Sequence, residues 1–410
     1  MTAPSPSLEP SDRAPGPASF ALAAEEIVAR LVASASPGPD GPSWHGRDVA
    51  PAGDSYVIAD GPVGDDLYGG RAGIAWVIAQ SPSGQDVALA AVHGAVAATL
   101  ATPVDALDLG LLTGATGIAA VADDIGRRLG DDALVADAHR LGLAVAQAVC
   151  AAGPAGDPDL MHGRAGTLLG LLALVGLDEP PVAAACRALG DSLVATVDTL
   201  ELCGYSHGGS GVARALEELA LATGDERYLG AADAAMRHER TWFSPMHGWP
   251  DLRGTADGSP LSYPAFWCHG AVGIGLARLA SFARRADLLA LAEASAAIGF
   301  ARNSVMAAMS GADAPLDSSL CHGVAGAAEL FLVAWEVTDA PEHLAAARRT
   351  GGLMMAHAQA AGGHYGSGLI DRSETPGLFL GLAGVAASLL RLHDPAALPS
   401  PATFPWSGRP

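Results

Sequence analysis

A pair of glycines with the spacing Gly-x-x-Gly recurs along the chain, each time before an apolar stretch. Successive first glycines lie 44, 49, 45, 62, 53 and 58 residues apart, which is room for two ordinary helices and their connections. Such a repeat constrains the fold strongly, because each unit must bury its apolar face against its neighbours. The seven copies begin at Gly70, Gly114, Gly163, Gly208, Gly270, Gly323 and Gly381 and end three residues later.

The segments after the glycines differ from those between them. Residues 167–175 are apolar on nearly every side, which marks a buried helix, whereas residues 342–349 are polar and one-sided. No stretch shows the sustained alternation that a large sheet would need. We therefore predict an all-α fold of seven helical hairpins, with an inner and an outer layer of helices and with the glycine turns at one mouth.

Composition changes outside the repeats. Residues 1–20 are rich in proline and serine, lack the order of a secretion signal, and are expected to form a disordered tail. Residues 21–394 are expected to form a single domain, and the proline-rich residues 395–410 an irregular tail. Two longer intervals predict insertions: an ordered aromatic loop near the mouth at 241–250 and a polar loop at 362–375.

The charge and the cysteine count exclude several classes of protein. The formal net charge is −21, and all 23 basic residues are arginines, so a nucleic-acid partner is not expected. No charge-free apolar run reaches the roughly 18 residues that span a bilayer. Five cysteines, an odd number in a large chain, do not form a disulfide framework. These features predict a cytoplasmic protein without a transmembrane segment, and the excess of Ala, Gly, Arg and Pro suggests a bacterial source.

Two glycine motifs also carry a thiol and an imidazole, in Trp267-Cys268-His269-Gly270 and in Cys321-His322-Gly323. Thiolates and imidazoles suit zinc, and three protein ligands leave a fourth position for water or substrate. Adjacent helical residues point about 100° apart, so a cysteine and the next histidine can share an ion only from an irregular turn. One such motif alone would fit a buried cysteine and a capping histidine better than a metal site; two in matching context predict a metal site.

These motifs, together with the seven glycine copies, resemble the lanthionine synthetase C family of bacterial cyclases and their eukaryotic LanC-like relatives. The similarity covers roughly residues 65–392. It implies an α/α toroid of seven inner and seven outer helices, including a ring closure that spacing alone does not show. It also implies a reaction, in which a cysteine of a dehydrated precursor peptide adds to dehydroalanine or dehydrobutyrine and makes a thioether ring.

The resemblance further implies the site residues. Carried over by motif, Cys268, Cys321 and His322 bind one zinc ion per chain. His207, just before the fourth glycine motif, is the expected proton donor, and Asp159 either orients His207 or takes up the substrate proton. Without the resemblance, His207 fits an ordinary loop histidine and Asp159 a helix N-cap.

The chain departs from some bacterial members at two positions. Those members have tyrosine after the first zinc cysteine, whereas this chain has His269, and the eukaryotic relatives also have histidine there. His269 either replaces the tyrosine as a proton donor or forms a hydrogen bond near the zinc. Pro264 stands where some have arginine, so substrate contacts are expected to differ. His162 is an additional imidazole near the mouth and is expected to be structural.

The leading functional prediction is a zinc-dependent lanthipeptide cyclase. Its precursor peptide would be dehydrated by a separate enzyme, since the segment before Asp65 is too short for a dehydratase domain. One alternative is a LanC-like enzyme that adds glutathione to dehydroamino acids in proteins, and another is a non-catalytic subunit that binds the peptide. A zinc prenyltransferase is disfavoured, because no basic cluster for a pyrophosphate accompanies the motifs.

Overall fold

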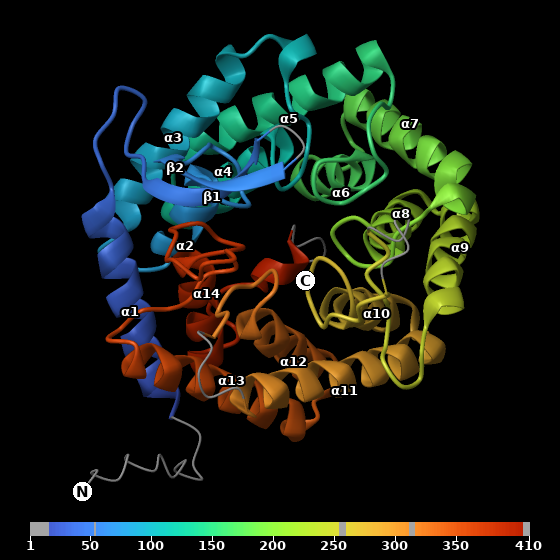
Figure 1. Cartoon of the computed structure of the whole chain (residues 1–410). Helices are drawn as coiled ribbons and strands as arrows, with labels where there is room; N and C mark the ends of the chain where they lie inside the picture. Colours follow the sequence, from blue (N-terminus) through green and yellow to red (C-terminus); the bar gives the residue numbers. More distant parts are fainter. Residues whose placement is uncertain (1–15, 53–54, 254–259, 311–315, 405–410) are drawn as a thin grey trace, which may run out of the picture.

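The computed structural model describes residues 16–52, 55–253, 260–310 and 316–404. Fourteen α-helices in this part of the chain form two concentric layers (Figure 1). The inner helices are α2 (Arg71–Ile78), α4 (Ala115–Leu129), α6 (Arg164–Leu174), α8 (Gly209–Thr223), α10 (Ala271–Arg285), α12 (Val324–Thr338) and α14 (Leu382–His393). The outer helices are α1 (Pro17–Ser34), α3 (Gln85–Ala101), α5 (Asp132–Ala152), α7 (Pro180–Thr196), α9 (Glu226–Trp242), α11 (Leu288–Ser310) and α13 (Pro341–Ala360).

The inner helices close into a ring. Each packs against the next one, and α14 packs against α2, so the predicted toroid of seven inner and seven outer helices is confirmed. Six of the helical pairs are consecutive in the chain, from α2 with α3 to α12 with α13. The seventh pair joins the two ends of the chain, because α14 packs against α1. The ring is thus held shut by residues more than 340 positions apart.

Helix α1 begins inside the segment predicted to be a disordered tail, 1–20. Pro17 occupies the first turn, where its missing N–H is not needed, and Phe20 is fully buried. Residues 17–20 are therefore helical, which corrects the predicted boundary, and residues 1–15 lie outside the described part.

The C-terminal segment predicted to be irregular, 395–410, packs onto the ring over its described part. It contains a short 3-10 helix, η4 (Pro401–Thr403), in which the Ala402 carbonyl accepts a hydrogen bond from Trp267 Nε1 at 2.8 Å. This end of the chain therefore contacts the turn that carries Cys268.

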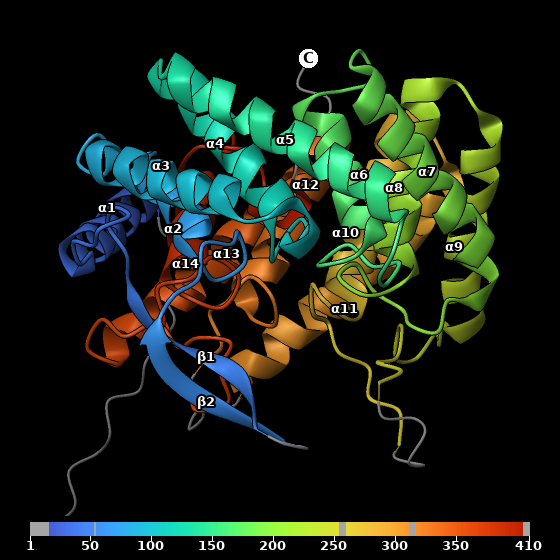
Figure 2. The same cartoon turned by 90° about the horizontal axis from the view of Figure 1, so that it is seen from above.

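Two further segments extend from one face of the ring (Figure 2). One is an antiparallel hairpin of β1 (His45–Ala52) and β2 (Ser55–Pro62), which the sequence pattern did not reveal. The other follows α9 and contains the loop predicted at 241–250, where the Phe243 ring lies 4.6 Å from Trp249. Two of the three aromatic side chains of that loop, Phe243 and Trp249, therefore pack on each other, whereas Trp242 at the end of α9 is exposed.

One described helix, α5, is long and apolar enough by composition to cross a bilayer. In the structure it is an outer helix that packs against α4 and α7.

The two glycines of each pair have separate roles. The first is the N-cap of the inner helix in all seven copies. The second approaches the carbonyl oxygen six residues earlier so closely that a side chain would not fit. A Cβ on Gly273 would lie 2.0 Å from the Trp267 oxygen, and the other six second glycines give values from 1.8 to 2.3 Å. The second glycine of each pair therefore allows the preceding turn to pack directly against the first turn of its inner helix.

Backbone hydrogen bonds connect the turns of neighbouring repeats around the whole ring. In each of these bonds the amide of one turn donates to a carbonyl of the next turn, over 2.8 to 3.3 Å. The bonds run from Tyr68 to Leu112, Leu112 to Met161, Leu160 to Ser206, Ser206 to Cys268, Trp267 to Cys321, Cys321 to Phe379 and Phe379 to Tyr68. This closed belt fixes the turns at one end of the inner helices.

Replacing Gly273 with alanine should destabilise the protein, because its Cβ would have to displace the Trp267 carbonyl. We expect a loss of about 1–3 kcal/mol in the free energy of unfolding, as for other overpacked sites. Gly299→Ala in α11 is the matched control, since nothing lies within 4 Å of its Cβ position; it should leave the stability unchanged or raise it by about 0.4–1 kcal/mol. Urea unfolding measures both, and equal stabilities of the two variants would contradict this role of the second glycine.

Candidate active site

The residues predicted to bind zinc lie on two neighbouring turns of the belt. Cys268 precedes α10, whereas Cys321 and His322 precede α12. The Trp267 amide donates to the Cys321 carbonyl at 2.9 Å, which holds the two turns side by side. The two Sγ atoms and one imidazole nitrogen lie within 4.8 Å of one another, and Cys321 Sγ is 3.3 Å from His322 Nε2. Cysteines 53 positions apart thus meet at one point.

This group could hold a metal ion. In a tetrahedral zinc site with Zn–S near 2.3 Å and Zn–N near 2.0–2.1 Å, a sulfur and a nitrogen ligand lie roughly 3.6 Å apart, close to the separation here. Both cysteines are buried and neither forms a disulfide. The hydrogen bond from the Cys321 thiol holds the pKa of Cys268 well below its ordinary value, while burial raises the pKa of Cys321. The pair therefore favours one buried thiolate, whose charge a bound cation would neutralise.

Neighbouring segments fix the second of these turns. The Ser319 hydroxyl accepts a hydrogen bond from the His322 amide at 3.2 Å. The Ser318 amide donates to the Gly366 carbonyl at 2.8 Å, so the polar loop predicted at 362–375 lies against this turn. That loop is therefore a wall of the candidate site.

His207 and Asp159 lie together on the turns before α8 and α6. His207 Nδ1 is 2.7 Å from Asp159 Oδ2, and Asp159 Oδ1 accepts the amides of His162 and Gly163 at 3.0 and 2.8 Å. Burial would raise the pKa of Asp159, but its hydrogen bond to His207 and the charges of His207 and His162 outweigh burial and lower it. The N-cap of α6 is Gly163, so Asp159 is not a helix N-cap; it binds two amides of the turn before the helix and also holds His207.

His269 connects His207 to the cysteine pair. Its ring stacks on that of His207, with 5.4 Å between centroids and 19° between planes, and it directly follows Cys268 in the chain. The side chain is buried, and neither ring nitrogen has a hydrogen-bond partner among the described residues. Burial lowers the pKa of His269, which favours the neutral imidazole. All six predicted site residues therefore occupy one region of the mouth.

Comparison with known proteins identifies the family. The sequence matches the family model described as lanthionine synthetase C-like protein over residues 61–404. The chain belongs to this family. Among solved structures, nisin cyclase superposes on this LanC-like protein with a TM-score of 0.59 at 16% sequence identity, covering 80% of this chain and 89% of that chain. At that identity the likeness shows the toroid fold. No curated protein matches the sequence.

Arg253 is a charged residue of this LanC-like site that was not predicted from the sequence. It lies in the segment after α9 and pairs with Asp251, with 2.7 Å between Nη2 and Oδ2. The pKa of Arg253 is raised, first by the hydrogen bond to Asp251 and, among smaller causes, by the charges of Cys268 and Cys321. Its guanidinium is therefore within electrostatic reach of the candidate metal ligands. The only signal in the sequence was its place in the longest interval between glycine motifs.

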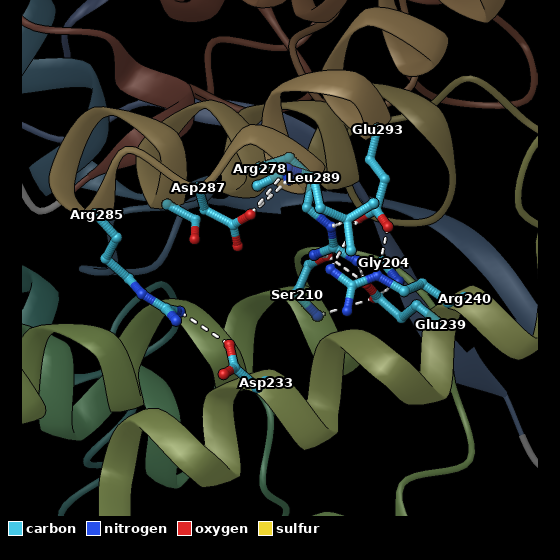
Figure 3. Close-up of polar contacts among 12 residues, drawn as sticks. Gly204, Ser210, Asp233, Glu239, Arg240, Arg278, Arg285, Asp287, Leu289 and Glu293 are labelled. Atoms are coloured by element: carbon cyan, nitrogen blue, oxygen red, sulfur yellow. Dashed lines mark hydrogen bonds and ion pairs between the residues drawn. The ribbon is translucent and has the colours of Figure 1, made fainter. Parts of the chain in front are cut away.

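A buried ion-pair network, also missed, holds the turn of His207 (Figure 3). Glu239 of α9 accepts the amides of Gly204 and Ser210, which flank His207, at 2.9 Å each. Arg278 of α10 donates to Glu239 at 2.8 Å and to Glu293 of α11 at 2.6 Å. Arg278 and Glu239 are fully buried. An outer helix thereby fixes both ends of a catalytic candidate's turn.

Removing Arg278 should leave Glu239 as an uncompensated buried charge. We expect Arg278→Met to destabilise the protein by about 3–5 kcal/mol, and we expect the double variant with Glu239→Gln to recover part of that loss. Denaturant unfolding of the two variants and of the parent protein checks both expectations. A loss below about 1 kcal/mol for the single variant, as for exposed ion pairs, would contradict the proposed contribution of this network.

Proposed function

We propose that this LanC-like protein is a zinc-dependent lanthipeptide cyclase that acts on a dehydrated precursor peptide. The observation that carries the proposal is the meeting of Cys268, Cys321 and His322 at one point beside His207 and Asp159. Three protein ligands leave a coordination position for a substrate thiol. Membership of the family and a fold shared with a protein named nisin cyclase support the same function.

Zinc held by these three residues would favour the thiolate form of a peptide cysteine, since a coordinating thiol loses its proton. In the reaction, the peptide sulfur forms a bond to the β-carbon of dehydroalanine or dehydrobutyrine. The electron pair of the C=C bond moves toward the carbonyl group, and a proton must then reach the α-carbon. The thiol gives up one proton and the α-carbon gains one, so the thioether product is an isomer of the substrate.

His207 is the proposed proton donor. Its Nδ1 pairs with Asp159 Oδ2 at 2.7 Å, which fixes the ring and leaves Nε2 to face the substrate. The lowered pKa of Asp159 keeps this carboxylate ionised at neutral pH, so it can accept the hydrogen bond from His207 Nδ1. His269 is the second candidate, because both of its buried nitrogens lack partners among the described residues, and the single N–H of its neutral ring can donate to the carbonyl oxygen on which charge develops.

The decisive experiment compares two substrates. Purified zinc-loaded protein is incubated with a dehydrated, cysteine-containing peptide, and separately with glutathione plus a protein that contains dehydroalanine. Cyclisation does not change the peptide mass, so the readout is the number of thiols that still react with an alkylating reagent. We expect thiols to disappear from the peptide and glutathione to remain unreacted.

The other outcomes have defined meanings. Consumption of glutathione with no loss of peptide thiols would replace the cyclase with a glutathione-adding enzyme. If neither thiol is consumed while the peptide still binds, the protein is a peptide-binding subunit, and the catalytic proposal is wrong. A precursor gene next to a separate dehydratase gene would support the cyclase independently.

A further inference from the structure

A second group of metal-binding side chains lies at the mouth, separate from the cysteines. One ligand atom from each of Asp159, His162 and His207 lies within 4.8 Å of the other two. Asp159 Oδ2 faces both imidazoles, at 2.7 Å from His207 Nδ1 and 3.4 Å from His162 Nε2. The two imidazole centroids are 5.6 Å apart. No residue is shared with the Cys268, Cys321 and His322 group.

The carboxylate of this group is held in place before any ion arrives. Asp159 is buried, and its Oδ1 is occupied by two backbone amides, so only Oδ2 is directed at the imidazoles. Asp157 adds a second carboxylate, with Oδ2 at 3.1 Å from His162 Nε2. The group therefore offers two nitrogen atoms and up to two oxygen atoms, a donor set that suits zinc and neighbouring divalent transition metals.

The group is also accessible from solvent. The side chains of His162 and His207 are 43% and 27% exposed, in contrast to the buried cysteines. His162 in addition lines a cavity of about 720 Å³ between the ends of α5 and α6. A metal ion can thus reach these residues without passing the first site.

We propose that Asp159, His162 and His207 form a second, weaker site for divalent metal ions such as zinc, and that an ion bound there inhibits the enzyme. The ion takes the place of the proton shared between His207 Nδ1 and Asp159 Oδ2. With the ion on Nδ1, His207 keeps only its Nε2 proton, and giving up that proton would leave a metal-bound imidazolate, so His207 becomes a poor proton donor to the substrate. The inhibitory half rests on the proposed function, whereas the binding site itself does not.

The geometry explains why this site is the weaker one. With metal–ligand bonds of about 2.0–2.1 Å, tetrahedral ligands lie roughly 3.3–3.4 Å apart. The distance from His162 to Asp159 already matches this value, but the 2.7 Å contact between His207 and Asp159 must open. The site also lacks the thiolates of the first group, which are strong ligands for zinc. Occupancy therefore requires zinc in excess of the first equivalent.

The test uses His162→Asn, which removes one ligand of the second site and none of the first. Metal-free protein is titrated with zinc in a calorimeter. A second titration uses cobalt(II), which gives an absorption band when it is bound by thiolates and therefore reports only on the cysteine site. We expect two binding events in the parent protein, only the first of which develops the thiolate band, and one event in His162→Asn. His93→Asn is the matched control, because His93 pairs with Asp131 at 2.7 Å and belongs to neither group of potential metal ligands found among the described residues; it should keep both events.

Cyclisation assays at rising zinc test the inhibitory half. Excess zinc should lower the rate of the parent protein and of His93→Asn on the order of 100-fold, the contribution typical of a general acid, and should leave His162→Asn unaffected. A single binding event in the parent protein, or two in His162→Asn, overturns the site. Two events without loss of rate overturn the inhibition alone. If no protein cyclises peptide at any zinc concentration, the proposed function fails while the calorimetry still decides the site.

Discussion

Replacing Cys321 with alanine should abolish metal binding and almost all cyclisation. Cys321 Sγ lies 3.3 Å from His322 Nε2 in a buried position, so its removal leaves only two ligands, Cys268 and His322. Loss of an outer-shell partner of a metal site costs roughly 10–100-fold in affinity or activity, and the loss of a ligand should exceed this range. Metal analysis and the peptide-thiol assay measure the two effects.

Cys150→Ala is the control for the Cys321 variant. Cys150 is an exposed free thiol on α5, so its removal should change neither the metal content nor the rate. If Cys321→Ala lost its metal and the purified variant still cyclised peptide, the proposed catalytic role of the metal would be wrong. If it kept a full equivalent of metal, the assignment of the ligands would be wrong.

Replacing His207 with glutamine should lower kcat by about 100- to 10,000-fold, the contribution typical of a general acid. The metal content should remain at one equivalent, because His207 is not in the cysteine group. The Michaelis constant should change little, since the proton is needed only as the C–S bond forms. Steady-state kinetics on a dehydrated peptide, with metal analysis of the same sample, check this expectation.

Asp159→Asn is the informative companion to the His207 variant. An asparagine can still accept the backbone amides of the turn and contact His207, but it removes the negative charge that faces His207 Nδ1. We expect a smaller loss of kcat than for His207→Gln. A full rate in His207→Gln would move the role of proton donor to His269, whose ring stacks on that of His207.

The sequence predicted the layers of the fold better than it predicted the ring closure. Each inner helix begins directly after the first glycine of a pair, so the repeats marked the start of the inner layer. Helix α1 carries no glycine pair and lies at the other end of the chain from its partner α14, so no local pattern indicated that they pack together. Its apolar residues, including Phe20 and Ile27, indicate burial but do not identify a partner.

The residue types of the candidate site could be predicted from the sequence. Its assembly depends on contacts between turns, which the spacing of motifs along the sequence does not show. Cys268 meets Cys321 because the Trp267 amide bonds to the Cys321 carbonyl. Glu239 supports the turn of His207 from an outer helix, where a glutamate in a polar segment resembles any surface residue. Arg253 lies in an insertion without a motif. Residues that hold a turn through its backbone amides, or that lie in an insertion, leave no periodic pattern in the sequence.

The central claim is that Cys268, Cys321 and His322 hold one zinc ion with a position open to a peptide thiol. X-ray absorption at the zinc edge tests it most directly, because it counts the sulfur and nitrogen neighbours of the ion. We expect the zinc ion to have two sulfur neighbours in the free protein and three after a cysteine peptide is added. A count that stays the same when the peptide binds, or a free protein whose zinc has no sulfur neighbour, would contradict it.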